Sequence, residues 1–516
     1  MRPSWASLND LTAHAGLCSL SSDYFYDLSL EAREQPDDRE QSRVHRIKSE
    51  PFDHPPPKAF SPDYSVNLSM PSHTEELNKA RNCAQIIQFA PNGKKYSNTQ
   101  QARVEPNKRL KDVFGIDNVF TNETSVRKME FLKEVECLML NAMKMTDHTK
   151  DGNWGNLSHQ AIAFLDDYMK RADTGSLDLA ELTQYIVLKQ SLCYLFEGTD
   201  EVLKKSDTQF EDITYIGRRI NELWIETKKA GTNLPKEHQL VWSNEKALHN
   251  ALRRVTFTMP NPSSSVPGGF ISNDMGIPSR DPEIPRQNPL NLLLPAYETM
   301  WRVVMRCFLE VQHRNAQKSP DWLAVLRQYL EDLSDPECKP NEAFHKSSDA
   351  TGKVCPAEIV KEALRLYPPT RRVHRMFNGE AVAANIEECQ RFSILAGKDP
   401  LSFRPERWRE ICSEERQAFY DAAAGTSWID YKRLKDSLKR EEEALGHMPF
   451  AYYCAADHPK TKEFASKMIA LLVAVLCHGL GNNWELEDPT ILPPTGMPLG
   501  SDRGEYEKLM LKRRIS

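Results

Sequence analysis

The sequence of 516 residues lacks the features by which several protein classes are recognised. Its 11 cysteines include no Cys-x-x-Cys pair, and their scatter from Cys18 to Cys477 is typical of reduced cytosolic thiols rather than of a disulfide framework or a zinc site. Neither sign of charge dominates, with 67 Lys and Arg against 73 Asp and Glu, so the composition gives no reason to expect a nucleic-acid partner. The length allows a large buried core, in one domain or in two.

Long apolar runs are also scarce. The first thirty residues contain Asp10, Asp23 and Asp27 and no continuous apolar stretch, so neither a signal peptide nor an N-terminal membrane anchor is expected. The nearest approach to a membrane span, residues 464–480, contains Lys467 and His478 and is short for a bilayer, which favours a buried helix. We therefore expect a cytoplasmic protein, or one bound peripherally at the endoplasmic reticulum.

The composition changes along the chain. Residues 31–75 are rich in Asp, Glu, Arg, Ser and Pro, which predicts a disordered polar arm over residues 1–80. The remainder, residues 81–516, is expected to form one large domain. Within it, residues 259–289 contain seven prolines and a Gly-Gly pair and predict a long loop.

Helical periodicity dominates the large domain. Apolar residues recur at three- and four-residue spacing in four segments, 130–145, 157–171, 177–196 and 210–230. Strand patterns are few and short, and we assign them to residues 84–89 and 373–377. The segment 290–312 is apolar on most faces, so it predicts a helix that crosses the core. The expected class is mainly α with a small β component.

Two polar motifs stand out in the second half of the chain. Glu362 and Arg365 lie three apart on a predicted helix, residues 356–367, which Pro368 and Pro369 end, so the two side chains share one face and can pair. A Pro-Glu-Arg-Trp motif that contains Arg407 follows about forty residues later. Taken alone, a Glu-x-x-Arg pair is also common on solvated helices.

Together these motifs resemble those of the cytochrome P-450 haem-thiolate monooxygenases, and their sequences are most similar to those of filamentous-fungal members. The resemblance implies a P-450-like fold in which Glu362, Arg365 and Arg407 form a buried structural triad. It also places Arg375 where the family has a basic residue that binds a haem propionate, a task suited to a forked guanidinium. The alternative for Arg375 is an ordinary surface arginine.

The resemblance extends to the central helix. The family carries an acid and a hydroxyl that relay protons, and Glu298 and Thr299 match them in the run Pro295-Ala296-Tyr297-Glu298-Thr299. Pro295 and Ala296 depart from the pair of small residues that the family carries there, but Pro295 is expected to free a carbonyl group and kink the helix. Simple helix composition is the alternative interpretation of this run.

The segment 448–463 corresponds to the family's haem-ligand loop and is altered in this chain. Phe450 matches the phenylalanine that begins the loop and is the expected cofactor contact, while Tyr453 takes the position of a glycine. The position of the ligand cysteine falls on Asp457 or His458. Three outcomes remain open: iron bound by His458, iron bound by Cys454, or no axial ligand from the protein. No second propionate clamp is in register after residues 114–121.

Two functions follow as expectations. The first is a haem-dependent monooxygenase that oxidises a lipophilic small molecule with electrons from NADPH through a reductase, in a setting of fungal secondary metabolism. The second is a catalytically inactive protein of the same fold, motivated by the missing cysteine. A peroxide-using haem protein with His458 as ligand is a third, because imidazole ligation is typical of globin- and peroxidase-like iron.

Overall fold

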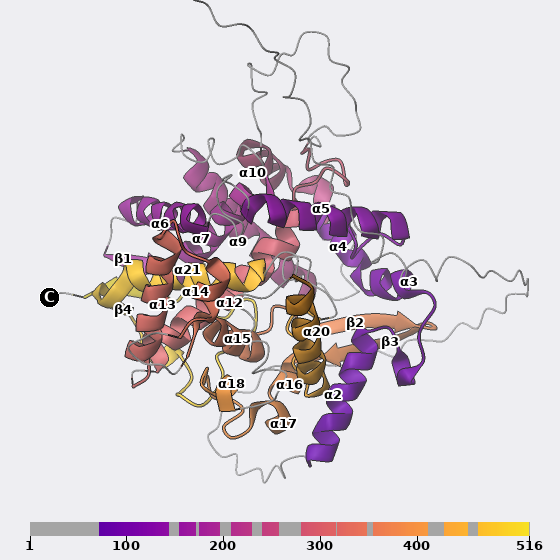
Figure 1. The fold of residues 1–516 in the computed structure, drawn as a ribbon. Helices are drawn as coiled ribbons and strands as arrows, with labels where there is room; N and C mark the ends of the chain where they lie inside the picture. Colours follow the sequence, from indigo (N-terminus) through magenta and orange to yellow (C-terminus); the bar gives the residue numbers. More distant parts are fainter. Residues whose placement is uncertain are drawn as a thin grey trace, which may run out of the picture. The chain divides into compact units, whose positions relative to one another are not determined.

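The computed structural model describes residues 72–143, 154–171, 175–196, 208–229, 240–256, 280–315, 317–347, 354–410, 428–451 and 463–514. These residues belong to a unit that spans Ser69–Ser516, distinct from Met1–Leu68. Helices dominate this unit and the strands are short, so the predicted class, mainly α with a small β component, is confirmed. Figure 1 shows the arrangement.

The helices and strands follow one another along the chain. The helices are α2 (His73–Ile87), α3 (Thr99–Val104), α4 (Lys108–Phe114), α5 (Ser125–Met143), α6 (Trp154–Arg171), α7 (Leu179–Leu195), α9 (Thr208–Lys229), α10 (Lys246–Thr256), α11 (Leu290–Leu293), α12 (Thr299–Leu309), α13 (Ser319–Ser334), α14 (Pro340–His345), α15 (Pro356–Leu366), α16 (Ile386–Gln390), α17 (Ser393–Ala396), α18 (Arg407–Glu410), α20 (Trp428–Ala444) and α21 (Phe464–Leu480). The strands are β1 (Ser176–Asp178), β2 (Arg372–Phe377), β3 (Glu380–Asn385), β4 (Trp484–Leu486) and β5 (Met510–Arg513).

The core forms around α21, against which α6, α12, α13 and α15 pack. Every residue from Phe464 to Cys477 is buried, as expected for a helix that is apolar all round. A stretch that includes α21, Phe464–Asn483, has the length and composition of a membrane span, yet 83% of its most apolar window is buried inside the protein. The prediction of a buried helix at residues 464–480 is therefore confirmed.

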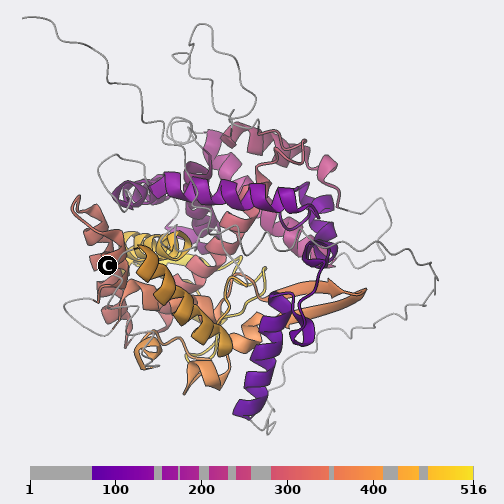
Figure 2. The same cartoon turned by 45° about the vertical axis from the view of Figure 1, so that its right-hand side comes forward.

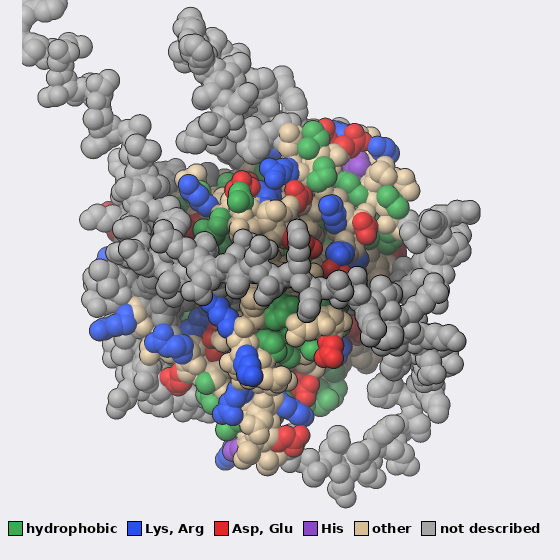
Figure 3. All heavy atoms as spheres, turned by 90° about the vertical axis from the view of Figure 1, so that its right-hand side faces the viewer, with side chains coloured by type: hydrophobic (Ala, Val, Ile, Leu, Met, Phe, Trp, Pro, Cys, Tyr) green, Lys and Arg blue, Asp and Glu red, His purple; other side chains and the backbone are tan. Residues whose placement is uncertain are grey.

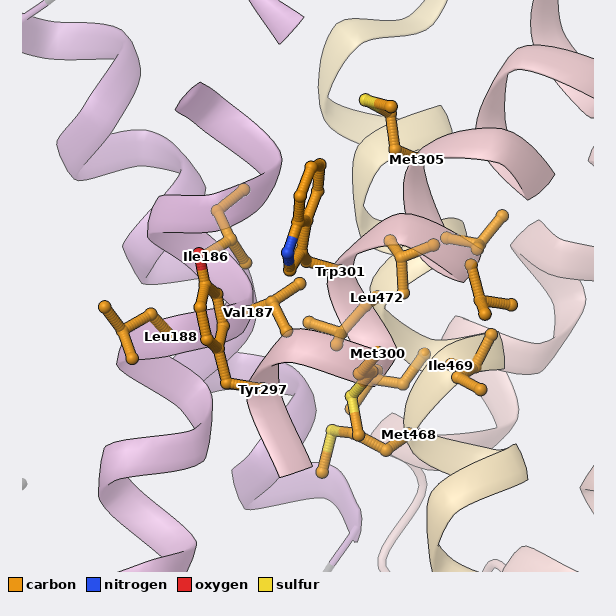
Figure 4. Close-up of a cluster of buried hydrophobic side chains, with 14 of the residues drawn as sticks. Ile186, Val187, Leu188, Tyr297, Met300, Trp301, Met305, Met468, Ile469 and Leu472 are labelled. Carbon is orange, nitrogen blue, oxygen red and sulfur yellow. The ribbon is translucent and has the colours of Figure 1, made fainter. Parts of the chain in front are cut away.

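Figure 4 shows how three helices that are distant in sequence share this core. The central helix runs without a break from α11 through a π-helical turn, Leu294–Glu298, into α12. Ile186 and Val187 of α7 face its residues Tyr297 and Trp301, and α12 in turn meets α21. Met300 and Met468 fill the space between those last two helices. The central helix thus crosses the core, as its apolar composition predicts.

A smaller apolar cluster lies between the β2–β3 hairpin and helices α2, α3 and α16. Figure 2 shows the hairpin beside α2. The strands pair antiparallel, with Val373 opposite Ala384. They turn through Asn378 (φ 52°) and Gly379 (φ 85°), the Asn-Gly sequence that type I′ hairpin turns favour. The strand predicted at residues 373–377 is confirmed.

The strand predicted at residues 84–89 is wrong, because most of this segment is the last part of α2. Ala80, Cys83, Ile86 and Ile87 are all buried, and their spacing of three and four residues places them on one helical face. A short apolar run does not distinguish a strand from a helix end.

Helix α2 also begins inside the arm predicted for residues 1–80. Ser72 caps it, since its hydroxyl accepts a hydrogen bond from the Glu75 amide at 3.3 Å. Glu76 is buried and accepts hydrogen bonds from the Ser393 amide, the Ser393 hydroxyl and the Ile394 amide. This contact anchors the start of α2 on α17, which no local pattern predicts.

Two further boundaries differ from the sequence prediction. The helix predicted from residue 177 begins at Leu179, because residues 176–178 form β1, which pairs with β5 in a three-stranded sheet of order β1-β5-β4. The Asp178 carboxylate then caps α7 through the Glu181 amide at 2.9 Å. Most of the loop predicted at residues 259–289 lies outside the described residues, and 280–289 contain turns but no helix or strand.

The surface shown in Figure 3 carries basic and acidic side chains side by side. No single sign of charge dominates the part of this face that the structure describes, in keeping with the balanced composition.

Candidate functional site: buried charges around the central helix

The structure brings Glu362, Arg365 and Arg407 together in a buried cluster. All three are almost fully buried, with exposures of 0%, 0% and 1%. Arg365 donates two hydrogen bonds to Glu362, at 2.9 and 2.8 Å, and Arg407 donates one at 2.9 Å. Glu362 and Arg365 lie one helical turn apart on α15, whereas Arg407 starts α18.

Both guanidinium groups use all their donors. The remaining acceptors are backbone carbonyl groups of Gln390, Ala396, Lys398, Asp399, Pro400 and Ser402. Burial opposes the ionisation of Glu362, but Arg365 and Arg407 hold its pKa below the usual value. Because each charged group has a partner of opposite charge and each donor an acceptor, the cluster fixes the segment 396–404 against α15. Its role is therefore structural.

Arg375 lies on β2 and is only 8% exposed, so it is not an ordinary surface arginine. Its guanidinium stacks over the Phe89 ring at 4.5 Å, and Arg103 stacks over the same ring at 5.2 Å. Its Nη1 atom donates only to the His374 carbonyl at 3.0 Å, and its buried Nε atom has no hydrogen-bond partner. Among the described residues no carboxylate pairs with Arg375. Burial, and then the charge of Arg103, lowers the pKa of Arg375 to about 9.

The central helix widens where the proline lies. Helix α11 continues into a π-helical turn, η8 (Leu294–Glu298), before α12 begins at Thr299. Pro295 has no N–H group to continue the α-helical hydrogen bonds, which explains the irregular turn. The Thr299 hydroxyl donates to the Pro295 carbonyl at 2.7 Å. The predicted disturbance of the helix at Pro295 is confirmed.

One face of this helix is open. Between residues 290 and 311, a stretch the structure describes throughout, Pro295, Ala296 and Thr299 are only partly buried and all others are buried. The spacing of three and four residues places them on one side of the helix. We call these three residues the open face.

Glu298 does not lie on the open face. It is 2% exposed and forms an ion pair with Arg503, while its other oxygen accepts a hydrogen bond from Trp301 Nε1 at 3.1 Å. Arg503 also stacks over the Trp224 ring at 4.3 Å. The structure therefore separates the predicted relay pair: Thr299 is on the open face and Glu298 is held in an internal ion pair.

Phe450 is half-buried and packs against the main apolar cluster. Met448, two residues before it, is buried in the smaller cluster, and the Met448 amide donates to Gln390 at 2.9 Å. The segment resumes at Glu463, whose carboxylate contacts His345 at 3.1 Å. Cys454 and His458 lie outside the described residues, so both assignments as iron ligand stay predictions.

The residues present provide a partial fit to haem. Within the described part of the chain, Arg375 is a buried cation without an anion, as a propionate contact requires, and the open face of the central helix consists of short side chains. Arg127, which follows the segment 114–121, does not act as a second clamp in the described residues, because it donates to the Asp117 carbonyl at 2.9 Å and pairs with Glu130.

The sequence did not indicate Arg503, Arg103 or Phe89 as parts of this region. Arg503 is about two hundred residues from Glu298, and no motif marks it. A signal did exist for the hairpin that carries Arg375, since Asn378-Gly379 is a typical turn sequence.

No protein-family model matches this chain, and no curated protein matches it. Solved structures of cytochrome P450 proteins do resemble it. The heme domain of cytochrome P450DA is 14% identical, covers 84% of this chain and 85% of its own, and has a TM-score of 0.42. A cyanobacterial CYP120A1 with bound retinoic acid is 15% identical, covers 78% and 82%, and has a TM-score of 0.44. A variant of cytochrome P450 OleT in complex with arachidonic acid is 13% identical, covers 84% and 88%, and has a TM-score of 0.42. These structures match most of the chain at low sequence identity.

Proposed function

We propose that this protein binds haem and acts as a P-450-like monooxygenase on a lipophilic small molecule, with electrons supplied from NADPH through a reductase. The observation that supports the proposal best is Arg375, a guanidinium that is 8% exposed and has no anionic partner among the described residues. Such a group is costly to bury unless an anion meets it, and a haem propionate is an anion of suitable geometry. The fungal character of the motifs suggests secondary metabolism as its setting.

The residues of this chain would divide the work as follows. Arg375 would hold a propionate by charge-assisted hydrogen bonds, with Phe89 below it as a stacking surface. The triad of Glu362, Arg365 and Arg407 keeps the segment 396–404 in place. Thr299 presents its side chain on the open face, where a substrate would approach. Bound haem would supply oxygen activation, and thiolate ligation would favour cleavage of the oxygen–oxygen bond more than imidazole ligation.

Absorbance spectroscopy tests the proposal. The chain expressed with a haem precursor should show a Soret band, and the band of the reduced carbon monoxide complex should report thiolate or imidazole ligation. Cys454→Ser and His458→Ala then identify the ligand, because only the replacement of the true ligand removes the characteristic band. A chain that purifies folded without any Soret band would contradict the proposal.

Arg375→Gln tests the proposed propionate contact, with Arg372→Gln as the matched control. Arg372 is an exposed arginine on the same strand, so its replacement removes the same charge without touching the buried position. We expect haem affinity to fall about tenfold or more in Arg375→Gln, the effect of losing a charge-assisted hydrogen bond, and to stay unchanged in the control. Equal haem affinity in both variants would refute the contact.

A catalytically inactive protein of the same fold is the second candidate. The ion pair between Glu298 and Arg503 favours it, because a buried carboxylate that is held by an arginine is poorly suited to pass protons. Turnover measured with purified reductase and NADPH separates the two candidates. Haem binding without oxygen-dependent NADPH consumption, over a broad set of lipophilic compounds, would support the inactive protein.

A further inference from the structure

The side of the central helix that carries the open face continues into two arginines. Thr299, Arg302 and Arg306 follow one another at spacings of three and four residues, and Pro295 precedes Thr299 by four. Such residues lie on one side of a helix, and long helical side chains lean toward the N-terminal turn. Arg302 therefore lies next to the open face, one turn beyond Thr299.

Arg302 has no partner among the residues that the structure describes. It is 7% exposed, its Nε atom is buried without a hydrogen-bond partner, and its guanidinium forms no hydrogen bond or ion pair with any of those residues. Arg306, one turn further, differs sharply, since it donates to the carbonyl groups of Gly500 and Asp502 at 2.9 and 3.2 Å. Arg306 is thus explained by the fold, whereas Arg302 is not.

The two acids whose charges act on Arg302, Glu387 and Asp502, already pair with other arginines. The two oxygens of Glu387 accept from Arg371 at 2.8 Å and from Arg391 at 2.9 Å. Asp502 accepts from Arg371 at 3.0 Å, and its side chain is 77% exposed. Burial, and then the charge of Arg371, lowers the pKa of Arg302 to about 10, so this group is still charged at neutral pH. The neighbourhood of Arg302 therefore has an excess of positive charge.

We propose that Arg302 binds the carboxylate of a lipophilic small molecule that lies along the open face of the central helix. A planar carboxylate matches the fork of a guanidinium, and pairing would offset the cost of the buried charge. The apolar part of the ligand would lie toward Pro295, Ala296 and Thr299. The inference rests on the proposed function only in that the ligand would be the substrate. The binding site itself requires only residues of this chain.

Arg302 and Arg375 lie on different elements, α12 and β2. The guanidinium of Arg375 stacks over Phe89, which Arg103 also contacts, whereas Arg302 makes no such contact among the described residues. The two arginines are therefore tested by separate variants.

Calorimetric titration of the purified full chain with dodecanoate and with dodecanol tests the inference. The two probes share an apolar chain and differ in charge. We expect dodecanoate to bind about tenfold to a hundredfold more tightly, the range for hydrogen bonds to a charged group. Equal affinities, or no binding of either probe, would overturn the inference.

Variants assign the preference to one residue. Arg302→Gln should abolish the preference for dodecanoate, and the exposed control Arg372→Gln should retain it. Without ligand, Arg302→Gln should unfold at the same temperature as the unsubstituted protein or higher, because it removes an unpaired buried charge. A much lower unfolding temperature, or a preference that survives Arg302→Gln, would show that Arg302 serves the fold and not a ligand.

The two proposals fail in different ways. Absence of a Soret band would remove the monooxygenase proposal and leave the calorimetric preference for dodecanoate untouched. Haem binding with equal affinities for the two probes would remove only the carboxylate site.

Discussion

Replacement of Glu362 by Gln tests the buried triad most directly. The substitution keeps the shape of the side chain and removes its charge. The two oxygens of Glu362 accept from Arg365 Nε, Arg365 Nη2, Arg407 Nε and the Arg404 amide. A glutamine offers one oxygen, so in either orientation its NH₂ group faces at least one arginine donor. Two guanidinium groups with exposures of 0% and 1% would then remain without a counter-charge.

The free energy of unfolding is expected to fall by about 3–5 kcal/mol, the usual cost of removing one partner of a buried ion pair. Urea unfolding followed by circular dichroism measures it, with Glu342→Gln as the matched control. Glu342 pairs with Lys339 on the surface, where the two side chains are 38% and 62% exposed, so that control should lose less than about 1 kcal/mol.

The pH dependence gives an independent check. The folded-state pKa of Glu362 lies below its usual value, so its contribution is present above the unfolded pKa of about 4.3 and is lost as the pH falls through the folded pKa. The stability difference between Glu362→Gln and the unsubstituted protein should therefore shrink in acid. A loss no larger than that of Glu342→Gln at neutral pH would refute the reasoning.

Three further predictions concern single sites. Gly115→Ala should lower the free energy of unfolding in urea by about 2–4 kcal/mol, because the residue has φ +61° and its new Cβ would lie 2.1 Å from the Trp242 ring. The control Gly379→Ala, at φ +85° with open space around it, should lower it by only about 1–2 kcal/mol. Arg503→Met should lower the free energy of unfolding by about 3–5 kcal/mol, because Glu298 would stay buried without its partner. In a double-mutant cycle, adding Glu298→Gln should recover part of this loss, and purely additive losses would contradict the pairing. Burial lowers the pKa of His313 to about 4, so the folded state resists a proton that the unfolded state accepts near pH 6.5. The free energy of unfolding should therefore fall as the pH drops from about 6.5 to about 4, and it should fall less in His313→Gln. An equal pH dependence in both proteins would disprove the assignment.

The helical elements were largely readable from the sequence. Residues 157–171 and 210–230 carry periodic apolar patterns and residues 464–480 form an apolar run. Helices α6, α9 and α21 lie there with ends shifted by three residues or fewer. The segment 84–89 was misassigned because a short apolar run satisfies both periods. The end of a helix such as α2 depends on what it packs against, which is the hairpin and α16 in this fold.

The candidate site was predictable where its residues are local. Glu362 and Arg365 are one turn apart, so their pairing follows from helix geometry alone, and Pro295 disturbs its helix through its own missing N–H group. The partner of Glu298 was not predictable, because Arg503 belongs to the C-terminal segment and reaches Glu298 only in the folded chain. For the same reason the sequence presented Glu298 and Thr299 as one pair, although they lie on different sides of the helix.

By itself the sequence determined the helical class, the position of the core helices and the motif that pairs Glu362 with Arg365. These depend on periodicity and on contacts between neighbours in the chain. The tertiary structure decided which buried charges are met. Arg365 and Arg407 use every donor, whereas Arg302 and Arg375 lack an anionic partner among the described residues. That difference arises from the approach of segments far apart in sequence, because the cost of a buried charge depends on what surrounds it in space.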